Sequence, residues 1–325
     1  MDKGSVRAGE RIDYLDAVRG LAILLMIFVN FIAQYGVIPA WTKHATGDGF
    51  TYVDGIAPMF VFIMGISGAL SFTRRRETTG LRKTVLHALR RNGLLFFFGT
   101  IGTVLLYAAE GILEWNIFQT LAVAGVVALP FFFIKSSRIR IIAALALMVL
   151  YQLALTFFLA GALFQKEPAI PFLPSFVQSL ALATIVIFGS GLDEWIQRGR
   201  TGAAAGIACA VFCGVGLGLS SLIGPNRPMG SITYLFFGLA MAAGFLLLFY
   251  LAARWLRLKR VPLLSTLGRN PLVIFMIASV FTKVLNVLLP ENASALAVLS
   301  VAVALEAFCI AAARILEWKG VTIKL

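Results

Sequence analysis

Three polar side chains near the start of the chain lie in or beside two long apolar runs and could carry chemistry. The runs cover residues 21–37 and 56–72; Asn30 is inside the first, Asp54 precedes the second, and His44 is in the polar loop between them. An imidazole changes charge near neutral pH, so it can take a proton from an attacking amine or hydroxyl and return it. Asn30, His44 and Asp54 are therefore the candidate catalytic residues.

Each of the three also has a structural explanation. Asn30 could join two helices through its amide, His44 could be a solvated loop residue, and Asp54 could cap the helix that follows it. The catalytic interpretation rests on the shortness of the loop, in which Gly47 and Gly49 allow a tight turn. The three side chains could then meet at one mouth of a helix bundle.

A second set of polar residues could hold phosphate groups. Asp16 and Arg19 are three positions apart, which places them on one face of a helix, either as a local ion pair or with Arg19 facing a ligand phosphate. Arginines are also concentrated in residues 74–91. His87 in this segment is better explained as a residue at the membrane interface than as a catalytic residue. The candidate cofactor-binding residues are Arg19, Arg74, Arg75, Arg90, Arg91, Arg269 and Asn270. The last two precede a proline and could instead mark only the start of a helix.

The elements that must position these residues are membrane-spanning helices. Of 325 residues, 60% are hydrophobic and 13% are charged, with a mean hydropathy of +0.91, which is far more apolar than a soluble domain. The apolar runs do not alternate with period two, which excludes a β-barrel. We expect about ten helices, at residues 18–38, 52–73, 86–108, 115–134, 140–160, 175–192, 203–223, 231–252, 270–289 and 294–313. The fold class is an all-α polytopic membrane protein with one transmembrane domain over 1–325, in which 15–73 is the catalytic hairpin.

The basic residues predict the orientation of this bundle. Alternate connections are rich in Lys and Arg, whereas the others contain only Lys43, Lys166, Arg227 and, at a helix end, Lys283. The positive-inside rule therefore places both termini, including the segment 1–14, in the cytoplasm and His44 outside. The net charge of +13 is explained by topology, so no nucleic-acid partner is expected.

The remaining sequence features point to no additional chemistry. Cys209, Cys213 and Cys309 lie in apolar runs without the spacing of a metal site or a disulfide framework, so no metal is expected. The polar segment 1–11 and the long first run indicate that no signal peptide is cleaved. Small residues at 202, 206, 214 and 218 could allow close helix contact, which leaves a homodimer open.

The first seventy residues contain an ordered series of motifs: LDAVRG at 15–20, MIFVN at 26–30, KHA at 43–45, GFT at 49–51 followed by Asp54, and PMFVFIMG at 58–65. The series resembles the catalytic domain of the heparan-α-glucosaminide N-acetyltransferase family of transmembrane acyltransferases. Weaker similarities are NIFQTLA at 116–122 and LGRN at 267–270.

The resemblance implies that acetyl-CoA binds from the cytoplasmic side as co-substrate and that its acetyl group passes to the amine of a terminal glucosamine on the far side. The family's catalytic histidine falls on His44 and its associated asparagine on Asn30. The gap between Asn30 and His44 is longer here than in the eukaryotic enzyme of the family, and residues 31–34 replace the aromatic and glycine residues found there. The sugar acceptor could therefore be another cell-envelope glycan. The protein is expected in the bacterial inner membrane, with His44 as general base or as acetyl carrier.

Two other functional classes remain as alternatives. A small-solute transporter could use Asn30, His44 and Asp54 for binding without covalent chemistry, although only residues 268–271 form a clear helix break. A structural or assembly protein would tolerate the loss of His44. Stabilisation by acetyl-CoA distinguishes the acyltransferase from both.

Overall fold

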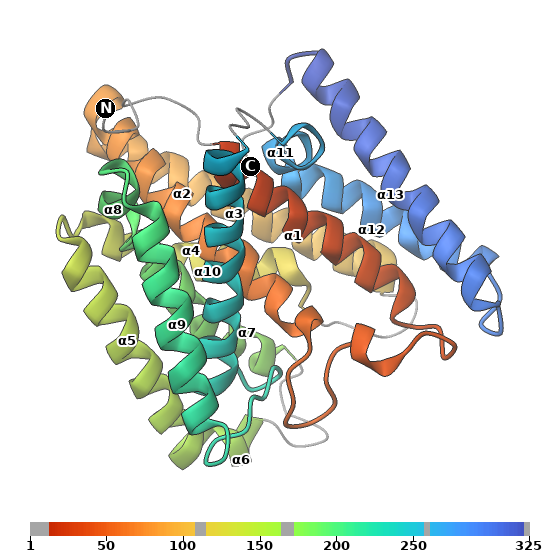
Figure 1. Ribbon diagram of the computed structural model, residues 1–325, viewed down its shortest axis with the longest axis horizontal. Coiled ribbons are helices and arrows are strands. Elements are labelled where there is room, and N and C mark those ends of the chain that lie inside the picture. Colours follow the sequence, from red (N-terminus) through yellow and green to blue (C-terminus); the bar gives the residue numbers. More distant parts are fainter. Residues whose placement is uncertain (1–12, 108–114, 164–171, 257–260, 322–325) are drawn as a thin grey trace.

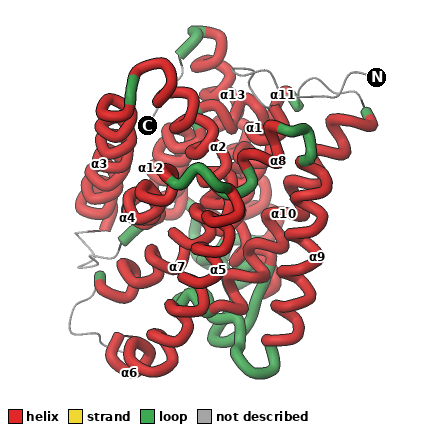
Figure 2. The backbone as a smooth tube through the Cα atoms, turned by 90° about the vertical axis from the view of Figure 1, so that its left-hand side faces the viewer, coloured by secondary structure: helices red, strands yellow, loops and turns green. Residues whose placement is uncertain are grey.

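The computed structural model describes residues 13–107, 115–163, 172–256 and 261–321, and these form helices and loops without strands (Figures 1 and 2). The α-helices are α1 (Asp13–Ile32), α2 (Ile56–Thr79), α3 (Leu81–Tyr107), α4 (Ile117–Ala128), α5 (Ser137–Ala154), α6 (Ala160–Leu163), α7 (Leu173–Ser190), α8 (Asp193–Gln197), α9 (Thr201–Leu219), α10 (Ile232–Trp255), α11 (Pro262–Arg269), α12 (Pro271–Leu288) and α13 (Ala295–Trp318). Short 3₁₀ turns are η1 (Ala40–Thr42), η2 (Tyr52–Gly55) and η4 (Leu129–Phe133), and a π-helical turn, η5 (Leu155–Leu159), follows α5.

The helices confirm the predicted all-α polytopic membrane fold. Within the described ranges, eight helices are long and apolar enough to cross a membrane. The two other expected spans coincide with α3, whose first half is rich in charge, and with the shorter apolar stretch Ile117–Phe133. The expected N-terminal segment 1–14 lies outside the described residues up to residue 12, and its last two residues belong to α1.

Helix α1 is displaced toward the N-terminus relative to the predicted span 18–38. It ends at Ile32, and the apolar residues that follow form a loop in which Tyr35 and Ile38 are buried. Hydropathy alone could not separate this buried loop from a helix, although Gly36 and Pro39 are ordinary turn signals. Asn30 therefore lies in the last turn of α1, not halfway along it as the apolar run suggested.

The short helix α11, which hydropathy did not predict, packs tightly against α1. A Cβ at Gly20 would lie 1.9 Å from the Leu264 carbonyl oxygen, and one at Gly268 would lie 1.9 Å from the Asp16 carbonyl oxygen. Only glycine allows backbones to approach this closely. The pair of glycines fixes the position of α11 beside the part of α1 that contains Asp16 and Arg19.

Helices α2 and α7 form the centre of the bundle. In their membrane windows, 72% and 78% of residues are buried, against 22–28% for α5, α9, α12 and α13 at the periphery. The short helices α8 and α11 lie at one end of the bundle, and the loop with η1 and η2 lies at the other (Figure 1).

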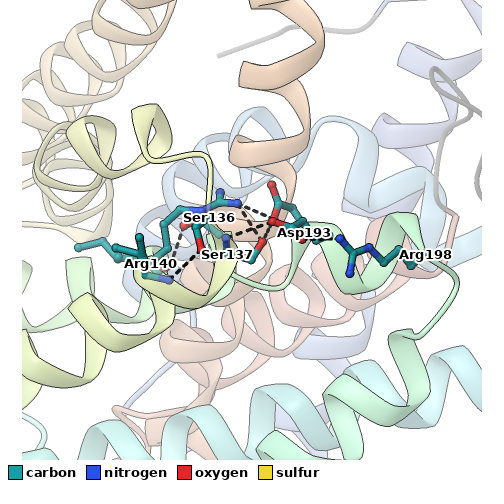
Figure 3. A network of polar contacts seen from close by, with 9 residues as sticks. Ser136, Ser137, Arg140, Asp193 and Arg198 are labelled. Carbon is teal, nitrogen blue, oxygen red and sulfur yellow. Dashed lines mark hydrogen bonds and ion pairs between the residues drawn. The ribbon is translucent and has the colours of Figure 1, made fainter.

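A buried ion pair joins α5 to the segment after α7 (Figure 3). Asp193 Oδ1 accepts hydrogen bonds from Arg140 Nη2 at 2.6 Å and from Ser137 Oγ at 2.8 Å, and all three residues are buried. Sequence reasoning assigned Arg140 only a topological role. In the structure Arg140 also anchors the start of α5 through its ion pair with Asp193. Removing either partner would leave an uncompensated buried charge.

Candidate functional site

Two cavities lie at opposite ends of the same group of helices. One, of about 560 Å³, is lined by Arg19 and is called the Arg19 cavity; the other, of about 450 Å³, is lined by His44 and is called the His44 cavity. Both are bounded by α1, α2, α3, α4, α7 and α12. Arg19 and Asn30, both on α1, are eleven residues apart, which corresponds to about 16 Å along a helix.

The catalytic candidates from the sequence meet in the His44 cavity, which is lined by Asn30, His44 and Asp54. His44 Nδ1 lies 2.7 Å from Asp54 Oδ1. The Asp54 side chain is fully buried, whereas that of His44 is 39% exposed. A carboxylate only accepts hydrogen bonds, so Nδ1 must be the donor. In the neutral ring, Nε2 is then an acceptor available to a ligand.

The polypeptide around η2 holds Asp54 in place. Asp54 Oδ2 accepts hydrogen bonds from the backbone N–H groups of Thr51, at 2.9 Å, and Ala45, at 3.2 Å. The same oxygen lies 3.1 Å from the Thr51 hydroxyl. Asp54 is thus the N3 residue of a capping box whose N-cap is Thr51, at the start of η2, and it does not cap α2 itself as the structural alternative predicted; it also orients His44. One oxygen serves the turn and the other serves the imidazole.

Asn30 is exposed to the His44 cavity, and its amide makes no hydrogen bond within the described part of the chain. The alternative in which Asn30 joins two helices predicts an interhelical partner, and the described residues provide none. An amide in this position can donate a hydrogen bond to a bound molecule.

Sequence reasoning missed several polar residues of the same cavity. Asn116 caps α4 and its Nδ2 donates to the Gly99 carbonyl at 2.7 Å, which explains the NIFQTLA motif as a helix start fixed against α3. Gln178 and Arg227 also line the cavity. Neither belongs to a recognisable motif, since they lie on a helix and a loop distant in sequence from His44.

The Arg19 cavity is strongly basic. It is lined by Arg19, Arg74, Arg75, His87, Arg91 and Arg269. Arg19 donates to Asp16 Oδ1 at 2.9 Å, to the Gly268 carbonyl at 3.1 Å and to the Ser67 hydroxyl, which confirms the local ion pair and ties α1 to α2 and α11. Guanidinium groups at this density suit a polyanionic ligand.

Two of the expected phosphate-binding residues lie outside this cavity. Arg90 is exposed on α3 and is absent from the cavity lining, although its neighbour Arg91 is part of it. Asn270 is buried, and its Nδ2 donates to the Val321 carbonyl at 3.1 Å. Arg269 both lines the cavity and pairs with Glu317 of α13.

A thin apolar layer separates the cavities. On α2, Ala57 lines the His44 cavity and Phe60 lines the Arg19 cavity. On α12, Phe275 lines the His44 cavity and Leu272 lines the Arg19 cavity. Each of these pairs is three residues apart, which is about 4.5 Å along a helix. A slender molecule that passed this layer would connect the two cavities.

Comparison with known proteins gives a family match over most of these elements. The catalytic model of heparan-α-glucosaminide N-acetyltransferase matches residues 11–213. The heparan-α-glucosaminide N-acetyltransferase of Mus musculus is 45% identical over 67 residues, which are 20% of this chain and 10% of that protein. Its Homo sapiens counterpart is 47% identical over 64 residues, 19% of this chain and 9% of that protein. The chain thus matches only about a tenth of the length of either relative.

Proposed function

Because the chain belongs to the heparan-α-glucosaminide N-acetyltransferase catalytic family, we propose that it transfers the acetyl group of acetyl-CoA to an amine or hydroxyl of a sugar. The observation that carries this proposal is the meeting of His44, Asp54 and Asn30 in one cavity, at the opposite end of the helix bundle from a basic cavity.

His44 acts as general base toward the acceptor. Its Nδ1–H donates to Asp54, so Nε2 is free to take the proton as the acceptor nitrogen or oxygen attacks the thioester carbon. The carbon–sulfur bond breaks, and the proton passes from Nε2 to the departing thiolate. Asp54 stabilises the imidazolium that exists between these two steps.

Asn30 supports the same step from the other side of the reacting carbon. Its amide donates to the thioester oxygen as negative charge develops there. An amide that already had a protein partner would be less suited to this role, so the lack of such a partner among the described residues favours the assignment.

The Arg19 cavity is the proposed site of the CoA phosphates. Arg74, Arg75 and Arg91 contact the head group there, while the pantetheine arm extends through the apolar layer toward Asn30. The arm needs to cover roughly half of the ~30 Å apolar core of a bilayer. By the positive-inside rule, the Arg19 cavity faces the cytoplasm and His44 faces outside.

Thermal melting combined with thiol release tests the proposal. Wild type and His44→Ala are solubilised in detergent, melted with and without acetyl-CoA, and then mixed with glucosamine while free thiol is measured. We expect both proteins to be stabilised, by about 2.7 kcal/mol at a hundred times the dissociation constant, and only wild type to release CoA. If acetyl-CoA stabilises neither protein, the donor assignment is wrong and a transporter becomes the better explanation.

A second measurement separates two chemical routes. In direct transfer His44 is only a base, whereas in the covalent route its Nε2 attacks the thioester first and carries the acetyl group. Acetylated His44 in protein incubated with acetyl-CoA alone would establish the covalent route. Its absence under conditions in which thiol is released only after acceptor addition supports direct transfer.

A further inference from the structure

One cation in the His44 cavity has no role in the reaction described above. Arg227 lines the cavity, and its side chain is 37% exposed. It lies in the loop after α9, beyond the residues 11–213 that the family model matches. Among the described residues that line this cavity, it is the one side chain with a permanent positive charge, and Asp54 is the one carboxylate.

Asp54 is satisfied without Arg227. His44, Ala45 and Thr51 already donate to its two oxygens. Arg227 Nε forms an ion pair with Asp54 Oδ1 at 3.4 Å, but this buried nitrogen makes no hydrogen bond. Within the described chain, no protein acceptor receives a hydrogen bond from this guanidinium group. The two groups are near each other, yet the arginine retains its hydrogen-bonding capacity.

The backbone of Arg227 is firmly positioned, so the open guanidinium is not a consequence of a loose loop. Its carbonyl accepts from Gln178 Nε2 at 2.6 Å and from the Gly230 N–H at 3.0 Å. The residues just before it are joined to the loop that contains His44. Asn226 Nδ2 donates to Asp48 Oδ1 at 2.8 Å, and the Gly49 N–H donates to the Pro225 carbonyl at 2.9 Å.

We propose that Arg227 binds an anionic group of the acceptor, a carboxylate, sulfate or phosphate, and thereby selects charged sugars over neutral ones. The inference rests on the proposed function, because it assigns the His44 cavity to the acceptor. A guanidinium presents its N–H groups in a planar fork that matches such oxyanions. The anion would bind to Arg227 on the side of the cavity that contains Asp54 and His44.

The test compares acceptors that share one ring and differ in charge. Glucosamine, glucosamine 6-sulfate and 2-amino-2-deoxyglucuronic acid are each titrated at saturating acetyl-CoA, and KM and kcat are obtained from thiol release. Saturating donor prevents the anionic acceptors from competing in the Arg19 cavity. The variants are Arg227→Gln and Arg227→Lys, with Arg198→Gln as the control, because Arg198 is exposed and pairs with Glu194 outside both cavities.

In wild type we expect the KM of at least one anionic acceptor to be lower than that of glucosamine by about 10- to 100-fold, the value of one charge-assisted contact. Arg227→Gln should bring the ratio of the two KM values close to one, Arg227→Lys should restore part of it, and Arg198→Gln should retain it.

Two results would overturn the inference while leaving the proposed function intact. These are equal KM values for charged and neutral acceptors in wild type, and a preference that survives in Arg227→Gln. If wild type releases no thiol with any of the acceptors, the proposed function itself fails and this inference fails with it.

Discussion

The two cavities are bounded by the same six helices but are built in different ways. In the His44 cavity one carboxylate accepts hydrogen bonds from three groups of Ala45 and Thr51, and it fixes one imidazole. The Arg19 cavity instead gathers guanidinium groups from several helices, of which Arg74 is exposed and Arg75 is half-buried. The first arrangement suits a reaction that needs precise geometry, and the second suits a charged head group that tolerates variation. The contrast predicts that single substitutions will have large effects at one end and graded effects at the other.

The largest effect should come from His44→Ala. Loss of a general base lowers turnover by about 10²- to 10⁴-fold, and acetyl-CoA affinity should stay near that of wild type because His44 is remote from the Arg19 cavity. Turnover is measured by thiol release and affinity by thermal stabilisation. Turnover within a factor of two of wild type would remove His44 from the chemistry.

Asp54→Asn should have the next largest effect. The amide can occupy the same space, but it cannot accept from Thr51, Ala45 and His44 with the strength of a carboxylate, and it can present an N–H to Nδ1 instead. We expect turnover to fall by about 100-fold and the loop to become less stable. Hydrogen exchange of residues 43–55 checks the second effect, and an unchanged turnover would contradict the positioning role.

Gly268→Ala tests how the Arg19 cavity is held together. The added methyl group would collide with the Asp16 carbonyl, so α11 must move away from α1, at a cost of about 1–3 kcal/mol. Melting temperature and acetyl-CoA affinity should both decrease. Gly214→Ala is the matched control, because a Cβ at Gly214 meets no atom within 4 Å. Equal melting temperatures for the two variants would contradict the close packing.

The smallest effects should distinguish two adjacent arginines. Arg91 lines the basic cavity and Arg90 does not. Arg91→Gln should weaken acetyl-CoA binding by about 10-fold, the loss of roughly one charge-assisted contact, whereas Arg90→Gln should change it little. Equal losses would mean that only the general positive charge of this end of the bundle attracts the donor, and those losses would disappear at high salt.

Sequence reasoning predicted the general fold and the three candidate residues that line the His44 cavity, but only part of the lining of each cavity. The hairpin of α1 and α2 carries its catalytic candidates close together in the chain, so motif and loop length sufficed for His44 and Asp54. Arg227 and Gln178 reach the same cavity from distant segments, and nothing in their local sequence indicates this. Likewise, the orientation of α3 about its own axis decides that Arg91 and not Arg90 lines the basic cavity. Helical periodicity alone does not predict which face of α3 points toward the cavity.

Buried polar contacts were the other features that hydropathy could not predict. Arg140 resembled one more cytoplasmic charge, and its partner Asp193 is more than fifty residues away in sequence. Helix α11 is too short to register as a membrane span, yet its glycine contact with α1 positions Asp16 and Arg19.

The proposal that the Arg19 cavity binds acetyl-CoA and the His44 cavity carries out the chemistry has one most direct test. Acetyl-CoA dissociation constants and thiol-release rates are measured in parallel on wild type, His44→Ala and Arg91→Gln. We predict that His44→Ala binds acetyl-CoA like wild type but does not release thiol, and that Arg91→Gln binds more weakly but regains turnover at saturating acetyl-CoA. If His44→Ala loses acetyl-CoA binding, or if Arg91→Gln binds it as tightly as wild type, the donor does not occupy the Arg19 cavity as proposed.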